Sequence, residues 1–220
     1  TPSDGDDTSL VYAVLSHYGR SVDVDPVLFY EVQDQDAGGH FCCYHGESDI
    51  SISANAHALE ALQAAGFDEN HPSMQNILGY LKSAQVLDTF WYDKWHSSPY
   101  YGSSHVIIAG SKLPDPEFQR MIANSIGWII NTQMENGAWG YYGTPTAEET
   151  AFCLQALIMW RRAGGKVPDK VIERGYNWLR HNMEPPYDRL WICKCLYNPV
   201  LITRSVILSA MVLGEQELQE

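Results

Sequence analysis

The sequence predicts an all-α protein, an α/α barrel (toroid) in which pairs of outer and inner helices repeat around a ring. Three observations favour this fold. A segment pattern recurs at intervals near fifty residues, each recurrence leads into an apolar stretch with helical spacing, and the pattern continues without intervening strands. Alternating polar and apolar helices can bury their apolar faces against each other by stacking in a ring, so the inner helices would form the barrel wall.

The repeated segments share an apolar residue, then Gln or an equivalent, then an aromatic residue after a short gap that usually bears glycine. Their starting points are separated by 81 − 29 = 52, 129 − 81 = 48 and 179 − 129 = 50 residues. This period fits two helices and two connections. The segments are FYEVQDQDAGGHF from Phe29, LKSAQVLDTFW from Leu81, IINTQMENGAW from Ile129 and LRHNMEPPYDRLW from Leu179.

The predicted inner helices follow the repeated segments, carry apolar residues at helical intervals and end near glycine, which is a common C-cap. They span residues 53–66, 103–110, 147–165 and 201–214, and residues 10–19 match them in pattern and ending. The chain therefore starts in mid-repeat, with four outer and five inner helices. A closed ring of six pairs needs twelve, so we expect part of the barrel upstream of Thr1 in the parent protein.

Composition narrows the function. A chain of 220 residues that is 45% hydrophobic can form one domain with a sizeable core, and its net charge of −13 argues against nucleic-acid binding. It has no apolar run long enough to span a membrane, and no segment resembles a signal peptide. The five cysteines, without C-x-x-C spacing, are expected to be reduced core thiols of a cytoplasmic protein rather than zinc ligands.

The segment SDGDDTS places three carboxylates, Asp4, Asp6 and Asp7, within four residues. Like charge and burial together can raise the pKa of one of them, which would keep it protonated near neutral pH as a proton donor. The alternative is a solvated helix start in which Asp4 caps the helix and the acids suit its dipole. The surroundings of the segment decide between the two interpretations.

Inner helices that all run the same way would gather their N-termini at one end of the ring, which we call the mouth. Polar and charged residues at the starts of the predicted inner helices should meet there. The mouth would carry Asp6, Asp7, Asn55, His57, His105, Glu148, Glu149, Thr203 and Arg204.

Five blocks of the sequence, in order, resemble class II terpene cyclases, with copalyl diphosphate synthases of bacteria and plants as the nearest group. The D-x-D-D array alone is a weak signal, but five blocks spread over nearly the whole chain are specific. The blocks are SDGDDTS, FWYDKWHSSPYY from Phe90, the Q-x3-G-x-W from Gln133 to Trp139, TAEETAFCLQAL from Thr146 and LWICKCLYNP from Leu190.

The resemblance implies that residues 1–220 are a β domain of the terpenoid cyclase type, paired with an upstream γ domain. It implies protonation of geranylgeranyl diphosphate and cyclisation to a bicyclic copalyl-type diphosphate, ent-copalyl diphosphate foremost, with the diphosphate retained. By match to D-x-D-D, Asp6 is the proton donor and is flanked by Asp4 and Asp7. Class II members use Mg²⁺ to accompany the diphosphate, and no ligand set for it is visible here, so its ligands are expected outside this chain.

Several residues are candidate substrate contacts. The resemblance places Lys94 on the diphosphate, with an ion pair to Asp93 as the alternative. Trp95, Tyr100 and Trp139 offer aromatic faces to the carbocation, although Trp139 could instead tie outer helices together. Asn55, with His57 and His105, is predicted to line the cavity and to take the final proton through water, the alternative for each His being a satisfied core residue. Arg204 is a second possible anion contact, and helix capping is a sufficient explanation for Glu148 and Glu149.

Two other functions stay open from the sequence. A triterpene cyclase like squalene-hopene cyclase shares D-x-D-D and the Q-x3-G-x-W repeats but needs no diphosphate site. A different α/α toroid, such as a protein prenyltransferase β subunit or a glycan-binding barrel, would share the helix pairs only. Equimolar bound zinc would favour the prenyltransferase, because its site needs an Asp, Cys and His set.

Overall fold

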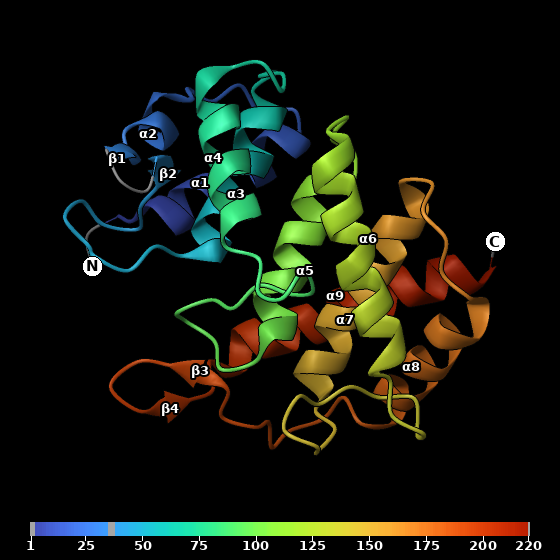
Figure 1. Cartoon of the computed structure of the whole chain (residues 1–220). Coiled ribbons are helices and arrows are strands. Elements are labelled where there is room, and N and C mark those ends of the chain that lie inside the picture. Colours follow the sequence, from blue (N-terminus) through green and yellow to red (C-terminus); the bar gives the residue numbers. More distant parts are fainter. Residues whose placement is uncertain (1–2, 35–37, 220) are drawn as a thin grey trace.

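The computed structural model describes residues 3–34 and 38–219 (Figure 1). Within these residues, nine α-helices form two layers, which agrees with the predicted five inner and four outer helices. The inner helices are α1 (Gly5–His17), α3 (Ile52–Ala64), α5 (Pro99–Gly110), α7 (Ala147–Arg162) and α9 (Val200–Gln219). The outer helices are α2 (Asp25–Leu28), α4 (Pro72–Ser83), α6 (Pro116–Asn131) and α8 (Asp169–His181).

Each inner helix packs against the next inner helix along the chain, from α1 through α3, α5 and α7 to α9. The three middle inner helices, α3, α5 and α7, are apolar on nearly every face because each has an inner helix on both sides and an outer helix behind it. Glutamines reinforce the ring: the Gln63 amide donates to the Ala109 carbonyl at 2.9 Å, and Gln155 donates to the Val206 carbonyl at 3.0 Å. The inner wall is therefore continuous across five helices.

The outer helices are amphipathic and pack one face onto the inner wall. In α8, for example, Ile172, Gly175 and Leu179 are buried while most of the helix faces solvent. Side-chain caps start most helices, since Asp115 accepts the Phe118 N–H of α6 at 2.8 Å and Thr146 accepts the Glu149 N–H of α7 at 3.1 Å. Local sequence thus sets the helix starts, and burial sets which face points inward.

The repeated aromatic residue has a structural role. The indole N–H of Trp91 donates to the Leu81 carbonyl and that of Trp139 donates to the Ile129 carbonyl, each ten residues earlier and at 2.7 Å. Both indoles are fully buried, and a side chain at Gly175 of α8 would collide with Trp139. The prediction that Trp139 contacts substrate is therefore wrong, because its ring fills the space between layers and its one donor is used there.

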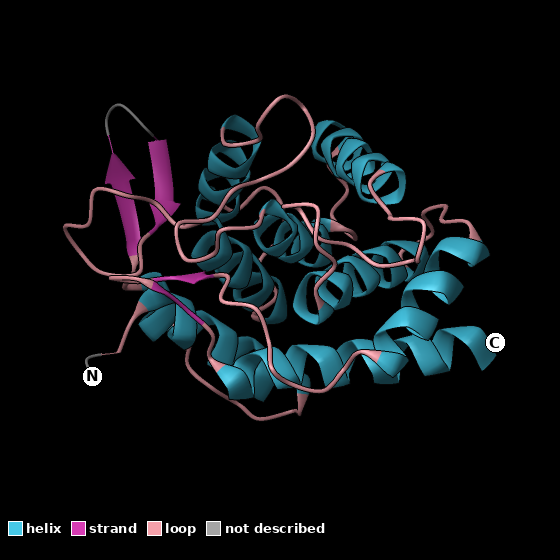
Figure 2. Ribbon diagram, turned by 90° about the horizontal axis from the view of Figure 1, so that it is seen from below, coloured by secondary structure: helices cyan, strands magenta, loops and turns pink. Residues whose placement is uncertain are grey.

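The expectation of a fold without strands is wrong at two places. The first repeated segment, from Phe29, forms strands β1 (Glu31–Asp34) and β2 (Gly38–Phe41), paired antiparallel with Glu31 opposite Phe41. The second hairpin joins β3 (Trp191–Ile192) and β4 (Leu196–Tyr197). Both hairpins lie on the side of the molecule that also holds the N-terminus (Figure 2).

The first repeat contains little helix. Its outer helix α2 has only four residues, and Gly39 in the following hairpin lies so close to α4 that a Cβ would come within 2.2 Å of the Asn76 side chain. That close approach lets β2 pack on α4, in the place where an outer helix would otherwise continue.

The first and last inner helices, α1 and α9, each carry an exposed apolar face. In the described part of the chain no other inner helix lies against these faces. No helix among the described residues is long and apolar enough to cross a membrane. The exposed side chains are Leu10, Val11, Val14 and Leu15 on α1 with Tyr18 directly after it, and Val200, Leu201, Ile202, Leu208, Val212 and Leu218 on α9.

The cysteines are only partly as expected. All five are free thiols, and Cys42, Cys43 and Cys153 are buried as predicted for core residues. Cys193 and Cys195 are exposed, because they flank the turn of the β3–β4 hairpin, where the Cys193 N–H donates to the Cys195 carbonyl at 3.2 Å.

Candidate active site

The first turn of α1 is fixed in place by its cap and by a glycine. Asp4 caps the helix, as predicted, by accepting the Asp7 N–H at 2.8 Å. Gly5 donates its N–H to the Cys43 carbonyl at 2.9 Å, and a Cβ on Gly5 would lie 2.1 Å from the Cys42 carbonyl oxygen. Only glycine permits this contact, which docks the helix start on the segment after β2 and thereby aims Asp6 at α3.

Asp6 is the acid at the centre of the site. Its side chain is 19% exposed, and it accepts hydrogen bonds from two residues of α3. The His57 Nδ1 lies 2.5 Å from one carboxyl oxygen and the Ser53 hydroxyl donates to the other at 3.0 Å. On its far side the His57 Nε2 lies 3.2 Å from the Nδ1 of His105 on α5. The predicted meeting of Asp6, His57 and His105 at the mouth is confirmed.

The electrostatics of Asp6 differ from the prediction. Burial raises the pKa of this carboxyl, but the hydrogen bond and positive charge of His57 and the bond from Ser53 outweigh burial, so the pKa is lowered from 3.8. The pKa of His57 is raised from 6.5, because its bond to Asp6 and the negative charge there outweigh burial. The sequence could not show this, because the imidazole comes from 51 residues away.

Asp7 is exposed and has the raised pKa that was expected of the central acid. Burial and the charges of Asp4 and Asp6 raise it. Asp4, half-buried, caps α1 and accepts the Tyr44 hydroxyl at 3.0 Å. The two flanking carboxylates thus act on the helix start and on the local field, while Asp6 alone reaches the histidines.

Asp93 forms a second buried carboxylate beside the first. It accepts the Ser51 hydroxyl at 2.9 Å and, at the N-terminus of α3, the Ser53 N–H at 2.8 Å, while its other oxygen accepts the Trp95 N–H at 2.8 Å. Burial raises its pKa more than these bonds lower it. Ser53 therefore links Asp93 to Asp6, and the suggested Lys94–Asp93 ion pair is absent from this part of the described structure.

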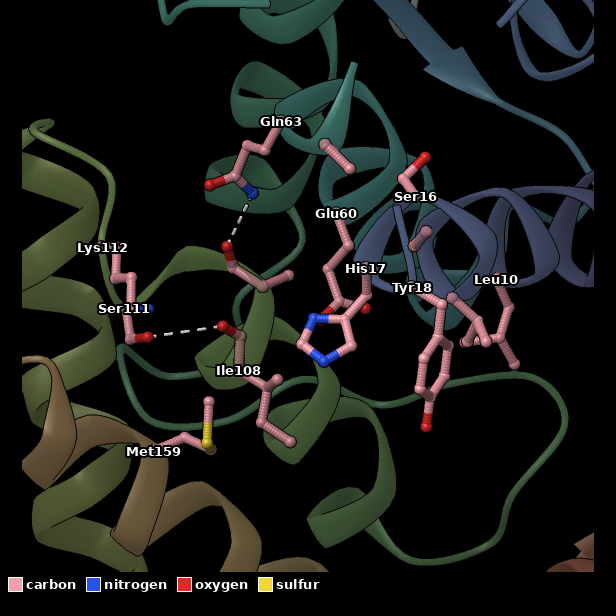
Figure 3. Close-up of a pocket in the computed structure, with 14 residues that line it drawn as sticks. Leu10, Ser16, His17, Tyr18, Glu60, Gln63, Ile108, Ser111, Lys112 and Met159 are labelled. Carbon is pink, nitrogen blue, oxygen red and sulfur yellow. Dashed lines mark hydrogen bonds between the residues drawn. The ribbon is translucent and has the colours of Figure 1, made fainter. Parts of the chain in front are cut away.

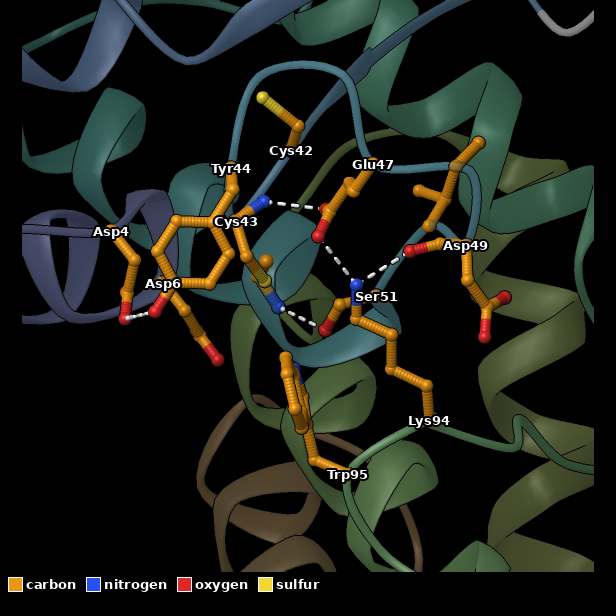
Figure 4. Close-up of polar contacts among 12 residues, drawn as sticks. Asp4, Asp6, Cys42, Cys43, Tyr44, Glu47, Asp49, Ser51, Lys94 and Trp95 are labelled. Atoms are coloured by element: carbon orange, nitrogen blue, oxygen red, sulfur yellow. Dashed lines mark hydrogen bonds and ion pairs between the residues drawn. The ribbon is translucent and has the colours of Figure 1, made fainter. Parts of the chain in front are cut away.

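Lys94 instead pairs with the loop before α3. Its ammonium lies 2.7 Å from the Glu47 carboxylate and 2.5 Å from the Asp49 carbonyl, and 4.9 Å from the centre of the Trp95 ring (Figure 4). Glu47 also accepts the Cys43 N–H at 2.7 Å. The lysine, the loop and the segment that docks α1 thus form one connected network beside Asp6.

Two predicted substrate contacts have other roles. Asn55 is fully buried and its amide is bound to main chain: it accepts the Phe41 N–H at 2.8 Å and donates to the carbonyls of Phe41 and Ser51. Tyr100 is turned toward the outer layer, where its hydroxyl donates to Thr132 at 2.8 Å and its ring stacks on Trp128. Both predictions are corrected, because neither side chain faces the mouth with a free polar group.

Tyr101, the residue after Tyr100, places an aromatic ring at the mouth. Its ring packs edge-on to His105 and to Trp191 of the β3–β4 hairpin and stacks on His96. The hairpin reaches this position because Ile192 donates its N–H to the Trp95 carbonyl at 2.8 Å. Two blocks that the sequence holds about a hundred residues apart are therefore paired by main-chain bonds.

The two glutamates of α7 divide their roles. Glu149 belongs to the helix cap, as capping predicts: its carboxylate accepts the Thr146 hydroxyl at 2.8 Å, and it also accepts the Tyr141 N–H at 2.9 Å. Glu148 is buried instead, with one oxygen accepting the Trp191 indole N–H and the Thr203 hydroxyl, each at 2.8 Å, and the other 3.7 Å from the His96 Nε2. Arg204, the second candidate anion contact, is exposed and pairs with neither glutamate.

The sequence reasoning missed Ser53, His96 and Trp191, and it preferred Tyr100 to Tyr101 as the aromatic contact. One signal was present: His105 follows His57 by 48 residues, the spacing between the repeats from Leu81 and Ile129. Residues one repeat apart occupy equivalent faces of neighbouring inner helices, so the pair could have been predicted. The other contacts depend on how loops fold back.

The site residues do not fit a metal centre. Among residues 3–34 and 38–219, no group of three or more His, Cys, Asp or Glu side chains is arranged to hold a metal ion.

Comparison with known proteins decides the family. The family model described as squalene-hopene cyclase C-terminal domain matches residues 47–192, about two thirds of the chain. The chain belongs to this cyclase family. The matched span runs from Glu47 to Ile192 and so includes both histidines, the Lys94 network and the start of the β3–β4 hairpin.

Two relatives of this chain are a diterpene cyclase and a copalyl diphosphate synthase by name. It is 42% identical over 221 residues to the type B diterpene cyclase of Mycobacterium tuberculosis, covering 100% of this chain and 42% of that protein. It is 34% identical to an ent-copalyl diphosphate synthase from a Streptomyces species, covering 96% of this chain and 41% of that protein.

Solved structures agree with the sequence comparison. The fold matches the ent-copalyl diphosphate synthase from Streptomyces platensis with a TM-score of 0.84 and 32% identity, over 97% of this chain and 42% of that one. The cyclase domain therefore spans about two fifths of the length of the relatives it matches, and its fold is a fragment of the terpene cyclase ring of helix pairs, as the sequence predicted.

Proposed function

We propose that this domain carries the acid of a class II diterpene cyclase, which cyclises geranylgeranyl diphosphate to a bicyclic copalyl-type diphosphate and leaves the diphosphate in place. One observation carries the proposal: Asp6 has its carboxyl group partly open at the mouth and held from behind by His57 and Ser53. The relatives' names support the substrate class, and ent-copalyl diphosphate is the product we propose first.

Protonation of an alkene needs a strong acid in a dry site. Asp6 gives its proton to the terminal double bond, the π electron pair becomes the new C–H bond, and the neighbouring carbon becomes a tertiary cation. The next two double bonds close the two rings, the double bond beside the diphosphate is retained, and loss of a proton from the last cation forms a new double bond. Hydrogen bonds from His57 and Ser53 stabilise the carboxylate left behind, which makes Asp6 a stronger acid than a free carboxyl.

Aromatic faces stabilise the cationic intermediates, at about 1–2 kcal/mol each when water is excluded. Tyr101 and Trp191 lie at the mouth close to His105, and Trp95 lies beside the Lys94 network. We propose these three rings, in place of Tyr100 and Trp139, as the aromatic contacts that this domain offers.

For the diphosphate end of the substrate, Lys94 stays our proposed contact on this chain. Its ammonium is already paired with Glu47, so binding a diphosphate requires that it exchange or share this partner. We propose that an upstream γ domain closes the site over the mouth and supplies the Mg²⁺ ligands.

A squalene-hopene-type triterpene cyclase is the second candidate, and the description of the matching family model favours it. The two differ in the substrate head group. The test is to incubate the intact gene product with geranylgeranyl diphosphate and Mg²⁺, or with squalene, then to treat with phosphatase and identify products by mass spectrometry.

Asp6→Asn is the matched variant in this test. We expect a bicyclic alcohol from geranylgeranyl diphosphate with the wild type, and a rate at least about 100-fold lower with Asp6→Asn, because the variant has no acid proton. Formation of cyclised squalene in place of the bicyclic alcohol would show that squalene is the substrate. An unchanged rate in the variant would show that another group is the acid.

A further inference from the structure

The main chain around Trp191 is anchored at the mouth by hydrogen bonds of strand β3. Ser97 donates its N–H to the Leu190 carbonyl and Ile192 donates its N–H to the Trp95 carbonyl, each at 2.8 Å. These bonds fix the backbone of β3 but not the rotamer of Trp191, which is half-buried and so offers part of its surface to a ligand. The direction of the indole therefore depends on contacts of the side chain itself.

Glu148 of α7 supplies the polar contact that orients this indole. One oxygen of its carboxylate accepts the Trp191 indole N–H and also the Thr203 hydroxyl, each at 2.8 Å. Glu148 is only 3% exposed, and a buried carboxylate costs free energy unless donors satisfy it. A hydrogen bond to an ionised acceptor is also stronger than one between neutral groups. The indole is thus held by a buried carboxylate that lies behind it.

His96 lies against the second oxygen of this carboxylate. Its Nδ1 accepts the Ser98 N–H at 3.1 Å, which assigns the ring hydrogen of the neutral imidazole to Nε2. That Nε2 lies 3.7 Å from Glu148, beyond hydrogen-bond distance, and within the described residues neither of these two buried atoms has another hydrogen-bond partner. The direct hydrogen bonds of the Glu148 carboxylate are therefore those from Trp191 and Thr203.

The oriented indole forms part of the aromatic wall beside the acid. Trp191 lies edge-on to Tyr101, with ring centres 5.2 Å apart, and edge-on to His96 at 5.5 Å. Tyr101 lies edge-on to His105 at 4.7 Å, and His105 belongs to the group of side chains around Asp6. A change in the direction of the indole would therefore change the shape of the wall near the acid.

Aromatic side chains distinguish the mouth from the other end of the inner helices. A cavity of about 700 Å³ lies among the C-terminal parts of α1, α3 and α5 (Figure 3). Among the described residues that line it, Tyr18 is the one tyrosine, and tryptophan and phenylalanine are absent. Aromatic faces stabilise carbocations, so the mouth is the end at which the shape of the wall bears on ring closure.

We propose that Glu148 is a positioning residue for ring closure: through the indole N–H it sets the place of Trp191 in the wall at the mouth, and it thereby favours the bicyclic product. This inference rests on the proposed function. An indole without this bond leaves room for water and for looser folds of the polyene. The cation then loses a proton early, or adds water and releases a proton, which gives monocyclic or hydroxylated diphosphates.

The ratio of these early products to the bicyclic product tests the proposal in the intact gene product, with geranylgeranyl diphosphate as substrate and mass spectrometry after phosphatase treatment. In Glu148→Ala the ratio should rise by about tenfold, the value of one hydrogen bond to a charged group. Substrate consumption should stay within about threefold of the wild-type rate, because Asp6 keeps its own partners.

Trp191→Phe tests the same bond from the other side, because it keeps an aromatic ring and removes the donor. We expect the same rise of about tenfold. The double variant should match Trp191→Phe, since Glu148 acts through the indole and the two effects are then not additive.

Two further variants separate positioning from loss of stability. Glu148→Gln keeps an oxygen that can accept the indole N–H, so its product ratio should stay within about threefold of the wild-type ratio. Glu149→Ala is the matched control, because it removes a buried carboxylate from the next position of α7, where the carboxylate accepts the Thr146 hydroxyl and the Tyr141 N–H. Its product ratio should equal that of the wild type.

An unchanged ratio in Glu148→Ala or Trp191→Phe would overturn the proposal, as would an equal rise in Glu149→Ala or a double variant in which the two rises multiply. If Glu148→Ala does not fold, the other two substitutions decide: no change in Trp191→Phe, or the full rise in Glu148→Gln, would contradict positioning by an acceptor. Absence of bicyclic product from the wild type, or an active Asp6→Asn, would instead refute the proposed function, so the two failures are distinguishable.

Discussion

At the scale of single residues, two properties of Asp6 oppose each other: its strength as an acid and the fraction of molecules in which it is protonated. A carboxyl held by burial alone would stay protonated near neutral pH but would be a weak acid. The bonds from His57 and Ser53 move Asp6 in the opposite direction, which lowers its pKa and strengthens it as a donor at the cost of a smaller protonated fraction.

The pH dependence of stability follows from the same pair. A His with a pKa raised above 6.5 stabilises the fold below pH 6.5, and that contribution is lost as the pH rises through the raised pKa. An Asp with a pKa lowered from 3.8 stabilises it above pH 3.8, and that contribution is lost as the pH falls through the lowered pKa. The pair should therefore stabilise the protein most between these two values.

We expect the free energy of unfolding of the wild type to be larger than that of Asp6→Asn at mildly acid pH. This difference should shrink above pH 6.5, by at most about 1.4 kcal/mol per pH unit. Urea denaturation of both proteins from about pH 5 to about pH 9 measures it. A difference independent of pH would contradict the ion pair.

At the scale of elements, the start of α1 depends on a glycine. In Gly5→Ala the new methyl group collides with the Cys42 carbonyl, so the first turn must move and carry Asp6 away from His57. We expect a cost of about 1–3 kcal/mol in unfolding free energy and a loss of at least about tenfold in turnover.

Gly79→Ala in α4 is the control for this substitution, because nothing lies within 4 Å of a Cβ at that helical position. It should stabilise the protein by about 0.5–1 kcal/mol and leave turnover unchanged. If Gly5→Ala matched the control in turnover, the placement of Asp6 would not depend on this contact.

Asn55 gives a second prediction at the element scale, since its amide joins β2 to α3. Asn55→Ala leaves the buried Phe41 N–H and carbonyl without partners, so we expect a loss of about 2–4 kcal/mol in thermal or urea unfolding. Asn182→Ala, at an exposed position, should cost about 0.5 kcal/mol or less. Turnover per folded molecule should be retained in both, whereas a substrate-binding Asn55 would show a raised KM.

At the scale of the whole molecule, we expect turnover to depend on what covers the open mouth. If a γ domain closes the site, as we propose, the 220 residues alone should turn over at least about 100-fold more slowly than the intact gene product, because the substrate is not held against Asp6. Product formation by the two proteins at equal concentration tests this, and equal activity would refute the need for a second domain.

The sequence by itself determined the repeat of about fifty residues, the five inner and four outer helices and the capped start at Asp4. These features are local or periodic, so they follow from residue spacing and helix capping. The family resemblance rested on the same blocks.

Only the tertiary structure decided what each side chain at the mouth does. It turned Asn55, Tyr100 and Trp139 toward packing, gave Lys94 the partner Glu47, and brought His57 behind Asp6. The physical reason is that a pKa or an ion pair depends on groups within a few ångströms, and here those groups come from helices and loops about fifty residues apart in the chain.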